Sequence, residues 1–344
     1  MIIRPVAATD LDALMNLAKS AGSGLTTLPA DEARLSSRIR WAQKTFAREV
    51  ERADADYLFV LEDDEGQVVG ITGLAGAVGL REPWYNYRIG MTLSASPKHG
   101  IYRPNQTLSL ANDLCGLSEV CSLFLHPEQR KGTNGRLLSL SRLVFLAEFR
   151  ELFSDKIIAE MRGVSDENGS SPFWEGLGKQ FFTMPFAQAD YLTGIGNKSF
   201  VAELMPRFPI YTSMLPPSAT ECIGVVHPNT RPALRLLETE GFAHRGYVDI
   251  FDGGPVVECE TAHIRAVRDS QPLILAVGTP SDTAVPWLIH NRKLAQCRIT
   301  CDHAHVAAGT LVVTSQTAQR LCLKAGDQVR AVPLYRPTIG DIRP

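Results

Sequence analysis

The stretch from Cys121 to Leu138 combines features that together could bind an anion. A strand is expected to end at Leu125, a loop with positive charge and glycine follows, and a helix opens near Gly135. Loop N–H groups and the positive end of a helix dipole both attract an anion, and Arg130 adds charge. The stretch has neither the Gly-Lys-Ser/Thr of a P-loop nor a Gly-x-Gly-x-x-Gly fingerprint. It therefore predicts an anion site, although an ordinary strand–helix turn explains this stretch equally well.

Two histidines stand where proton transfer could take place. His227 lies between Val226 and Pro228, directly before a predicted helix over 231–240. His126 closes the strand of the anion-site stretch, and Pro127 after it indicates a turn. Imidazole titrates near neutral pH and can serve as a general acid or base. Its position alone leaves His227 either structural or catalytic, whereas for His126 we prefer the structural interpretation.

The composition narrows the classes of protein that this chain can belong to. Its 344 residues carry a formal net charge of −2, from 35 basic and 37 acidic residues, without a long basic run. A nucleic-acid partner is therefore not expected. The first residues lack the layout of a signal peptide, and no apolar run approaches membrane-spanning length. We expect a soluble cytoplasmic protein without a membrane partner.

The seven cysteines are scattered and form no C-x-x-C pair. Such spacing provides no zinc set, so no metal site is predicted. An odd, dispersed count fits reduced thiols in a cytosol. Cys121, although it lies in the anion-site stretch, is interpreted as core filling.

Around these residues the sequence predicts alternating strands and helices. Strands are expected over 57–61, 68–74, 119–125, 155–161 and 246–251, helices near 11–18, 31–50, 135–149, 171–178 and 231–240, and loops at Pro97, Gly100 and Pro104. The helix over 135–149 is expected to be strongly amphipathic, and from 271 onward β-branched runs dominate. The order predicts an α+β fold, a mixed sheet flanked by helices. We divide it into units 1–186, 187–270 and a small β-rich subdomain, 271–344.

The strand–loop–helix stretch resembles the acyl-CoA signature of GCN5-related N-acetyltransferases. Arg130 and Gly135 fall in the expected register, while Thr133 replaces an expected glycine. The resemblance implies that the anion is the pyrophosphate of CoA, and that backbone groups at Leu123 and Leu125 bind the pantetheine arm. A helix like that over 171–178 often carries a tyrosine that protonates the CoA thiolate. Here Trp174 stands there, and an indole is no useful acid.

A repeat of that helix pattern at 233–242 predicts two GCN5-related halves, the second degenerate.

Further motifs resemble the arginine N-succinyltransferase family over nearly the whole chain. They are Gly24–Pro29, Pro83–Arg88, Ala159–Gly163, Ser171–Trp174, Ala202–Pro206, Val226–Pro228 and Phe251–Pro255. This resemblance implies succinyl-CoA as co-substrate, L-arginine as acceptor and no permanently bound cofactor. It places the catalytic proton donor at His227 and the CoA-thioester contact at Leu123. It also allows a paralogous subunit as a partner, and by analogy the β-rich tail and the long insertion favour an oligomer.

An arginine acceptor needs acids for its guanidinium and a base for its carboxylate. Glu160 and Arg162 alternate with Met161 on a predicted strand, so they share one face. We predict that Glu160, Arg162 and Asp252 bind the substrate, with a structural ion pair between Glu160 and Arg162 as the alternative. Another acyl-CoA, another basic amino acid, or a regulatory role in a heteromer remain alternative functions.

Overall fold

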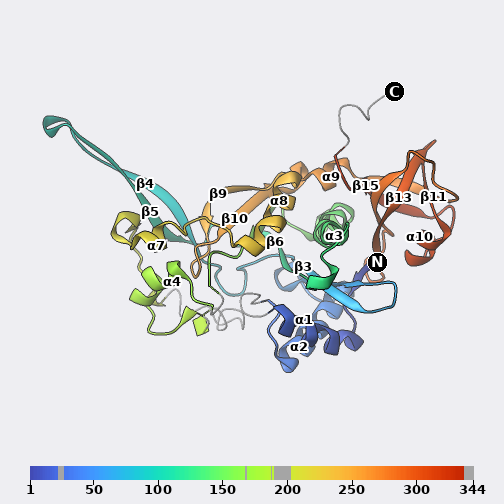
Figure 1. Ribbon diagram of the computed structural model, residues 1–344, viewed down its shortest axis with the longest axis horizontal. Coiled ribbons are helices and arrows are strands. Elements are labelled where there is room, and N and C mark those ends of the chain that lie inside the picture. Colours follow the sequence, from blue (N-terminus) through green and yellow to red (C-terminus); the bar gives the residue numbers. More distant parts are fainter. Residues whose placement is uncertain (22–26, 167–168, 187, 190–202, 337–344) are drawn as a thin grey trace.

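The computed structural model describes residues 1–21, 27–166, 169–186, 188–189 and 203–336 (Figure 1). The described strands form one sheet in the order β12 (Val285–His290), β15 (Gln328–Pro333), β11 (Gln271–Val277), β14 (Thr310–Val313), β13 (Ile299–Ala307), β1 (Ile2–Pro5), β2 (Asp56–Glu62), β3 (Val68–Ala75), β6 (Ser118–Leu125), β7 (Lys156–Glu160), β10 (Pro255–Glu260), β9 (Ala243–Val248), β4 (Asn86–Ser96), β5 (Ile101–Ala111) and β8 (Ile210–Tyr211). The α-helices are α1 (Leu11–Ala21), α2 (Glu32–Phe46), α3 (Asn134–Glu148), α4 (Pro172–Gly176), α7 (Pro217–Thr220), α8 (Arg231–Glu240), α9 (Arg265–Asp269) and α10 (Ser315–Arg320). The predicted mixed α/β fold is confirmed.

The sheet opens between its two central parallel strands. β6 and β7 pair only where Ser118 lies opposite Ile157 and Glu119 opposite Ile158. Beyond these pairs, β6 continues beside β3 and β7 continues beside β10. Parallel strands that separate leave backbone N–H and C=O groups without ladder partners on their facing edges. The opening therefore exposes hydrogen-bonding groups to any molecule that enters it.

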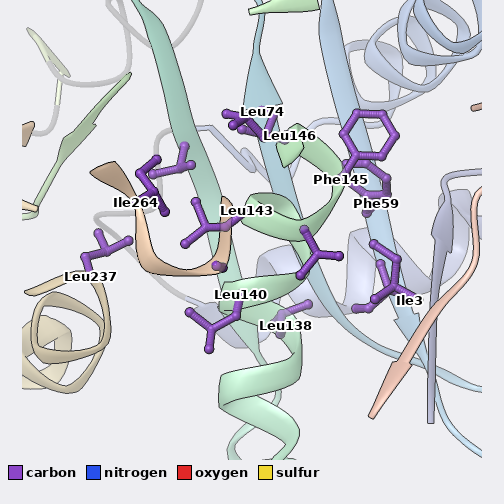
Figure 2. Packing of buried hydrophobic residues seen from close by; sticks show 14 of the residues in the cluster. Ile3, Phe59, Leu74, Leu138, Leu140, Leu143, Phe145, Leu146, Leu237 and Ile264 are labelled. Atoms are coloured by element: carbon purple, nitrogen blue, oxygen red, sulfur yellow. The ribbon is translucent and has the colours of Figure 1, made fainter. Parts of the chain in front are cut away.

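Helix α3 is buried on every side. Each residue from Leu137 to Leu146 is buried, so the predicted amphipathic pattern was wrong. The reason is a second covering layer: α3 packs on β3 and β6, and also contacts β12, β13 and β15. Figure 2 shows Leu138, Leu140 and Leu143 of α3 directed toward different neighbours in this core. A helix covered on all sides needs no polar face.

The C-terminal strands close into a barrel. β12 pairs with β13 on one side and with β15 on the other, which completes the ring β12-β15-β11-β14-β13. Glu148 at the end of α3 accepts hydrogen bonds from Arg292 Nε (2.8 Å) and Arg330 Nε (2.7 Å) of the barrel. These bonds fix the barrel against α3. The boundaries at residues 186 and 270 stay predictions, and β9 and β10 lie in the same sheet as β7.

Strands β4 and β5 form a long hairpin that projects from the body (Figure 1). The predicted loops at Pro97 and Gly100 coincide with its tip, but Pro104 lies within β5, opposite Leu93. A proline is tolerated there because β5 pairs with β8 only at Thr107 and Leu108, so Pro104 lies on an edge strand. The loop expected at Pro104 was therefore wrong.

No helix within the described ranges is long and apolar enough to cross a membrane.

Candidate active site

A cavity of about 1160 Å³ occupies the opening between β6 and β7. Its wall combines residues 119–125 of β6, residues 130–132 with the start of α3, and residues 159–162 at the end of β7 and directly after it. Residues 229–237 around the start of α8 and the turn at 249–252 complete it. The cavity thus joins the predicted anion site to the region before the helix that follows His227. Sequence segments about a hundred residues apart meet here.

A β-bulge in β6 shapes the middle of the cavity. Phe124 pairs with Ile71 and Cys121 with Gly73, so Ser122 and Leu123 together lie opposite one residue of β3. Ser122 has a φ of 53°, a left-handed conformation that is unusual for a residue with a side chain. A bulge leaves its extra residue outside the ladder, and its backbone groups are then available to a ligand. Leu123 therefore lies where a strand backbone can bind a carbonyl group.

A hydrogen bond from Arg38 of α2 stabilises the conformation of Ser122. Arg38 of α2 donates from Nη2 to Ser122 Oγ (2.9 Å) and from Nε to Asp56 Oδ2 (2.7 Å). The same guanidinium donates to the carbonyl oxygen of Thr27. Arg38 thus links α2, β2 and the bulge. Sequence reasoning missed this residue because its partners are distant along the chain.

The loop between β6 and α3 presents backbone to the cavity. Arg130 donates from Nε to the carbonyl oxygen of Leu125 (3.1 Å), and its guanidinium lies 5.7 Å from the ring centroid of Phe124. Gly132 has a φ of 54°, and a Cβ added at Gly132 or Gly135 would meet no atom within 4 Å. Helix α3 begins without a side-chain cap. Its first N–H groups and dipole therefore face space in which an anion fits.

His227 lies beside Arg162 and directly before Asn229, both of which line the cavity, but His227 itself is not among the described residues that form the wall. Its backbone N–H donates to the Arg162 carbonyl (2.8 Å), next to an isolated bridge between Gly163 and Val226. Its Nδ1 accepts from the backbone N–H of Asn229 (3.1 Å), so the neutral ring carries its proton on Nε2. Partial burial and the charge of Arg162 lower the pKa of His227 below its usual value. The ring is therefore neutral at pH 7.

Glu160 and Arg162 both line the cavity but have separate partners. Glu160 Oε1 accepts from Asn86 Nδ2 (2.7 Å) and Trp84 Nε1 (3.0 Å). Arg162 donates from Nη2 to Ser165 Oγ (2.7 Å). Trp84 and Asn86 were missed as carboxylate partners, although both fall in one of the motifs that carried the family resemblance. They orient a carboxylate toward the cavity.

Asp252 is buried where the chain turns beneath the cavity. Its Oδ2 accepts from the Gly163 N–H (2.6 Å) and its Oδ1 from the Gly254 N–H (2.8 Å). These bonds hold the segment after β7 against the turn before β10. Asp252 is thus suited to positioning Arg162 and its neighbours, and it offers a weaker contact for an external guanidinium than Glu160 does.

The two residues set aside from acid catalysis lie outside the cavity wall. Trp174 is fully buried, stacked on Phe182 at 5.2 Å, with Nε1 donating to the Met184 carbonyl (3.2 Å). His126 is partly exposed, with Nδ1 4.0 Å from Glu128. Among the described residues no cluster of His, Cys, Asp and Glu could hold a metal.

Comparison with known proteins identifies the family. The model for the arginine N-succinyltransferase beta subunit matches residues 1–266, and that for the C-terminal domain of this subunit matches 272–333. The "Arginine N-succinyltransferase subunit beta" of Pseudomonas aeruginosa is 65% identical over 334 residues, which cover 97% of this chain and 98% of that protein. An arginine N-succinyltransferase of Escherichia coli is 49% identical over 336 residues, covering 97% and 98%.

A solved structure supports the same assignment. It is the arginine/ornithine succinyltransferase subunit AI from Pseudomonas aeruginosa, which matches with a TM-score of 0.88 and 33% identity over 97% of this chain and 99% of that chain. The resemblance found in the sequence is confirmed, because sequence and structure agree from end to end. This chain belongs to the arginine N-succinyltransferase family.

Proposed function

We propose that this protein transfers the succinyl group of succinyl-CoA to the α-amine of L-arginine, giving N2-succinylarginine and CoA. The observation that carries the proposal is the cavity between β6 and β7, which runs from the uncapped start of α3 to Glu160 and Arg162. One end suits the pyrophosphate of CoA and the other suits a cationic amino acid. Family membership supports both substrates.

CoA would bind along the β6 side of the cavity. Its pyrophosphate would accept hydrogen bonds from the backbone N–H groups around Gly132 and Gly135 and gain from the dipole of α3. The pantetheine arm contains two amides and would pair with the free edge of β6 as another strand would, down to Leu125. At the bulge, the N–H of Leu123 would bind the thioester oxygen and stabilise the negative charge that develops on it. Arg130 forms part of the cavity wall at the Leu125 end of this path.

Arginine would bind on the β7 side. Glu160, held by Trp84 and Asn86, would accept the guanidinium, and Arg162 would bind the α-carboxylate. Asp252 would support this end through its bonds to the Gly163 and Gly254 backbone. The α-amine would then face the thioester, and positioning of this kind supplies a large part of a bimolecular rate enhancement.

His227 would act on the departing CoA. The bond from Asn229 to Nδ1 leaves the ring proton on Nε2, and the ring also hydrogen-bonds to the Ser165 backbone. In the proposed reaction the Nε2–H would exchange to the sulfur and stabilise it as the C–S bond breaks. The amine gives up a proton and the sulfur gains one, so the products are an amide and a thiol. Trp174 is fully buried and its Nε1–H donates to the Met184 carbonyl, so it does not compete for this role.

A thiol-release assay with the purified chain tests the function. Succinyl-CoA and acetyl-CoA are each combined with arginine, ornithine and lysine. We expect the highest kcat/KM with succinyl-CoA and arginine, and N2-succinylarginine as the product by mass spectrometry. Absence of thiol release with every pair contradicts the proposal for the chain alone. Higher kcat/KM with acetyl-CoA or ornithine replaces the proposed substrate.

The names of the relatives also bear on assembly and location. One is called subunit beta and another subunit AI. We therefore propose that this chain works in an oligomer and can pair with a paralogous subunit. All seven cysteines are free thiols, which supports a reducing compartment, the cytoplasm.

A further inference from the structure

Arg142 is a buried cation within the wall of the cavity. It lies on α3, is 2% exposed, and lines the space below the β6 bulge. Its guanidinium donates from Nε to the Ser139 carbonyl (3.0 Å), from Nη2 to Ser139 Oγ (3.2 Å) and from Nη1 to the Cys121 carbonyl (3.3 Å). All of these acceptors are uncharged. One N–H on each terminal nitrogen remains without an acceptor within the described part of the chain.

Other buried or partly buried arginines of the described chain show how the charge of a structural arginine is compensated here. Arg265, 3% exposed, lies 2.8 Å from Glu240, and Arg292 and Arg330 share Glu148. Each has a carboxylate within ion-pair distance, which offsets the cost of burying its charge. Arg142 has none within 4.0 Å among the described residues. Arg142 therefore differs from these arginines in lining a cavity instead of pairing with a carboxylate.

Arg142 remains charged at neutral pH although its side chain is buried. Burial lowers its pKa to about 10, and Glu119 opposes that shift from a longer distance. Burial also raises the pKa of the Cys121 thiol to about 12, so no thiolate compensates the charge. At neutral pH the cavity wall therefore contains a desolvated cation, which would gain from an anionic ligand.

The position of Arg142 matches the far end of a short acyl chain. Its Nη1 bonds to the carbonyl of Cys121, directly before the bulge at Ser122 and Leu123. If the thioester oxygen is bound at Leu123, as in the function proposed above, the acyl carbons extend into the cavity whose wall also includes Cys121 and Arg142. A succinyl group ends in a carboxylate there, and an acetyl group ends in a methyl.

We propose that Arg142 binds the terminal carboxylate of the acyl group and thereby selects a dicarboxylic monothioester over uncharged acyl-CoA donors. This rests on the proposed function and adds the residue that determines donor specificity. Neither Arg130 nor Arg162 serves this role: the first bonds back to the Leu125 carbonyl and the second lies on the β7 side. A bidentate arginine–carboxylate pair in a water-excluded site is among the stronger polar contacts that proteins make.

Arg142→Gln tests the assignment with two donors of equal carbon number. For the wild type we expect succinyl-CoA to be preferred over butyryl-CoA. In the variant, kcat/KM for succinyl-CoA should fall about a hundredfold, as expected for loss of a charged hydrogen-bonded pair, while that for butyryl-CoA stays equal or rises. KM for arginine and the Kd of free CoA should stay within about twofold. Equal losses with both donors, or a raised KM for arginine alone, overturn the assignment.

Arg136→Gln is the matched control. Arg136 lies on the same helix, lines the same cavity and places its guanidinium 4.9 Å from the Tyr335 ring centroid. Its loss removes the same charge but should leave the ratio of succinyl-CoA to butyryl-CoA turnover unchanged. An altered ratio of similar size in Arg136→Gln would show that net charge, not Arg142, determines donor choice.

A structure of the wild type with a non-reactive thioether analogue of succinyl-CoA decides the matter if Arg142→Gln does not fold. The acyl carboxylate within hydrogen-bond distance of the Arg142 guanidinium supports the assignment, and a carboxylate bound elsewhere overturns it. Failure of the proposed function is distinct, because it shows as absent thiol release in the wild type. The analogue structure then still tests Arg142 by itself.

Discussion

At the scale of single residues, the site depends on how a few side chains are held. His227 is oriented by Asn229 and Glu160 by Trp84 and Asn86. Each partner bonds to an atom of the functional group and so sets the orientation of that group. A change in such a partner should therefore alter turnover without removing the group that acts.

Replacement of His227 tests its role directly. His227→Ala should lower kcat about a hundredfold, in the range for general acid–base groups, with little change in KM for either substrate. His227→Gln keeps an N–H donor that does not titrate, so it should retain more activity than alanine. Steady-state kinetics check both, and His126→Ala is the control. Near wild-type turnover in His227→Ala would remove this residue from the mechanism.

The same variants predict a pH profile. The pKa of His227 is lowered, so the neutral ring persists below its usual pKa of about 6.5. Activity should be full at neutral pH and fall only as the pH drops through this lowered value, because protonation puts a second N–H against that of Asn229. In His227→Gln this acid limb should be absent from the kcat profile.

At the scale of elements, the strand–loop–helix unit of β6 and α3 is the proposed CoA site. Arg130→Glu should raise KM for succinyl-CoA about tenfold or more through repulsion of its phosphates, while KM for arginine stays within about twofold. Arg268→Glu, the same charge change at an exposed residue of α9, should change neither value. An equal rise for both substrates in Arg130→Glu would indicate damage to the fold, which circular dichroism can verify.

Local signals explain which elements could be predicted from the sequence. Strands β2, β3 and β6 and helix α8 follow from apolar spacing and from stops such as Pro127 and Gly241. The burial of α3 could not be predicted in this way, because its second covering comes from a barrel more than a hundred residues later. The burial of Arg142 could not be predicted either. Its only local signal was an arginine among the apolar residues Leu140, Leu143 and Phe145.

The family resemblance predicted most of the candidate site residues, whereas the residues that hold them in place became known only from the structure. Leu123, Arg130, Gly135, Glu160, Arg162 and Asp252 all line one cavity or its edge. The bulge at Ser122 and the support from Arg38 depend on contacts with β3 and α2, which no local spacing encodes. The roles of these residues stay proposals.

At the scale of the whole molecule, the barrel and α3 form one buried unit that acid should weaken. His290 of β12 is fully buried against Phe145, with Nδ1 accepting from the Arg292 N–H (3.0 Å) and Nε2 3.3 Å from Cys297 Sγ. Burial, together with Arg330 and Arg292, lowers its pKa to about 3. In the unfolded chain the ring takes up a proton near its usual pKa of about 6.5.

This difference predicts how stability depends on pH. The contribution of neutral His290 is complete above about pH 6.5 and is lost as the pH falls toward 3, since only the unfolded state binds the proton in that window. Between pH 7 and pH 4.5 we expect a loss of about 2–3 kcal/mol from this residue in chemical denaturation. His290→Phe should reduce that loss, whereas His303→Gln, at an exposed barrel residue, should not. Equal pH dependence in wild type and His290→Phe would contradict the assignment.

The two ends of the sheet differ in whether their strand edges can pair with another chain. Closure of β11 to β15 removes one end as a template for strand addition, whereas β4 and β5 have free outer edges beyond Arg88 and before Thr107. This hairpin exposes Met91 (65%), Leu93 (52%), Ile101 (54%) and Tyr102 (74%). If intermolecular β-pairing or aggregation occurs, it should therefore start at the hairpin, and a charge introduced at Leu93 should suppress it first.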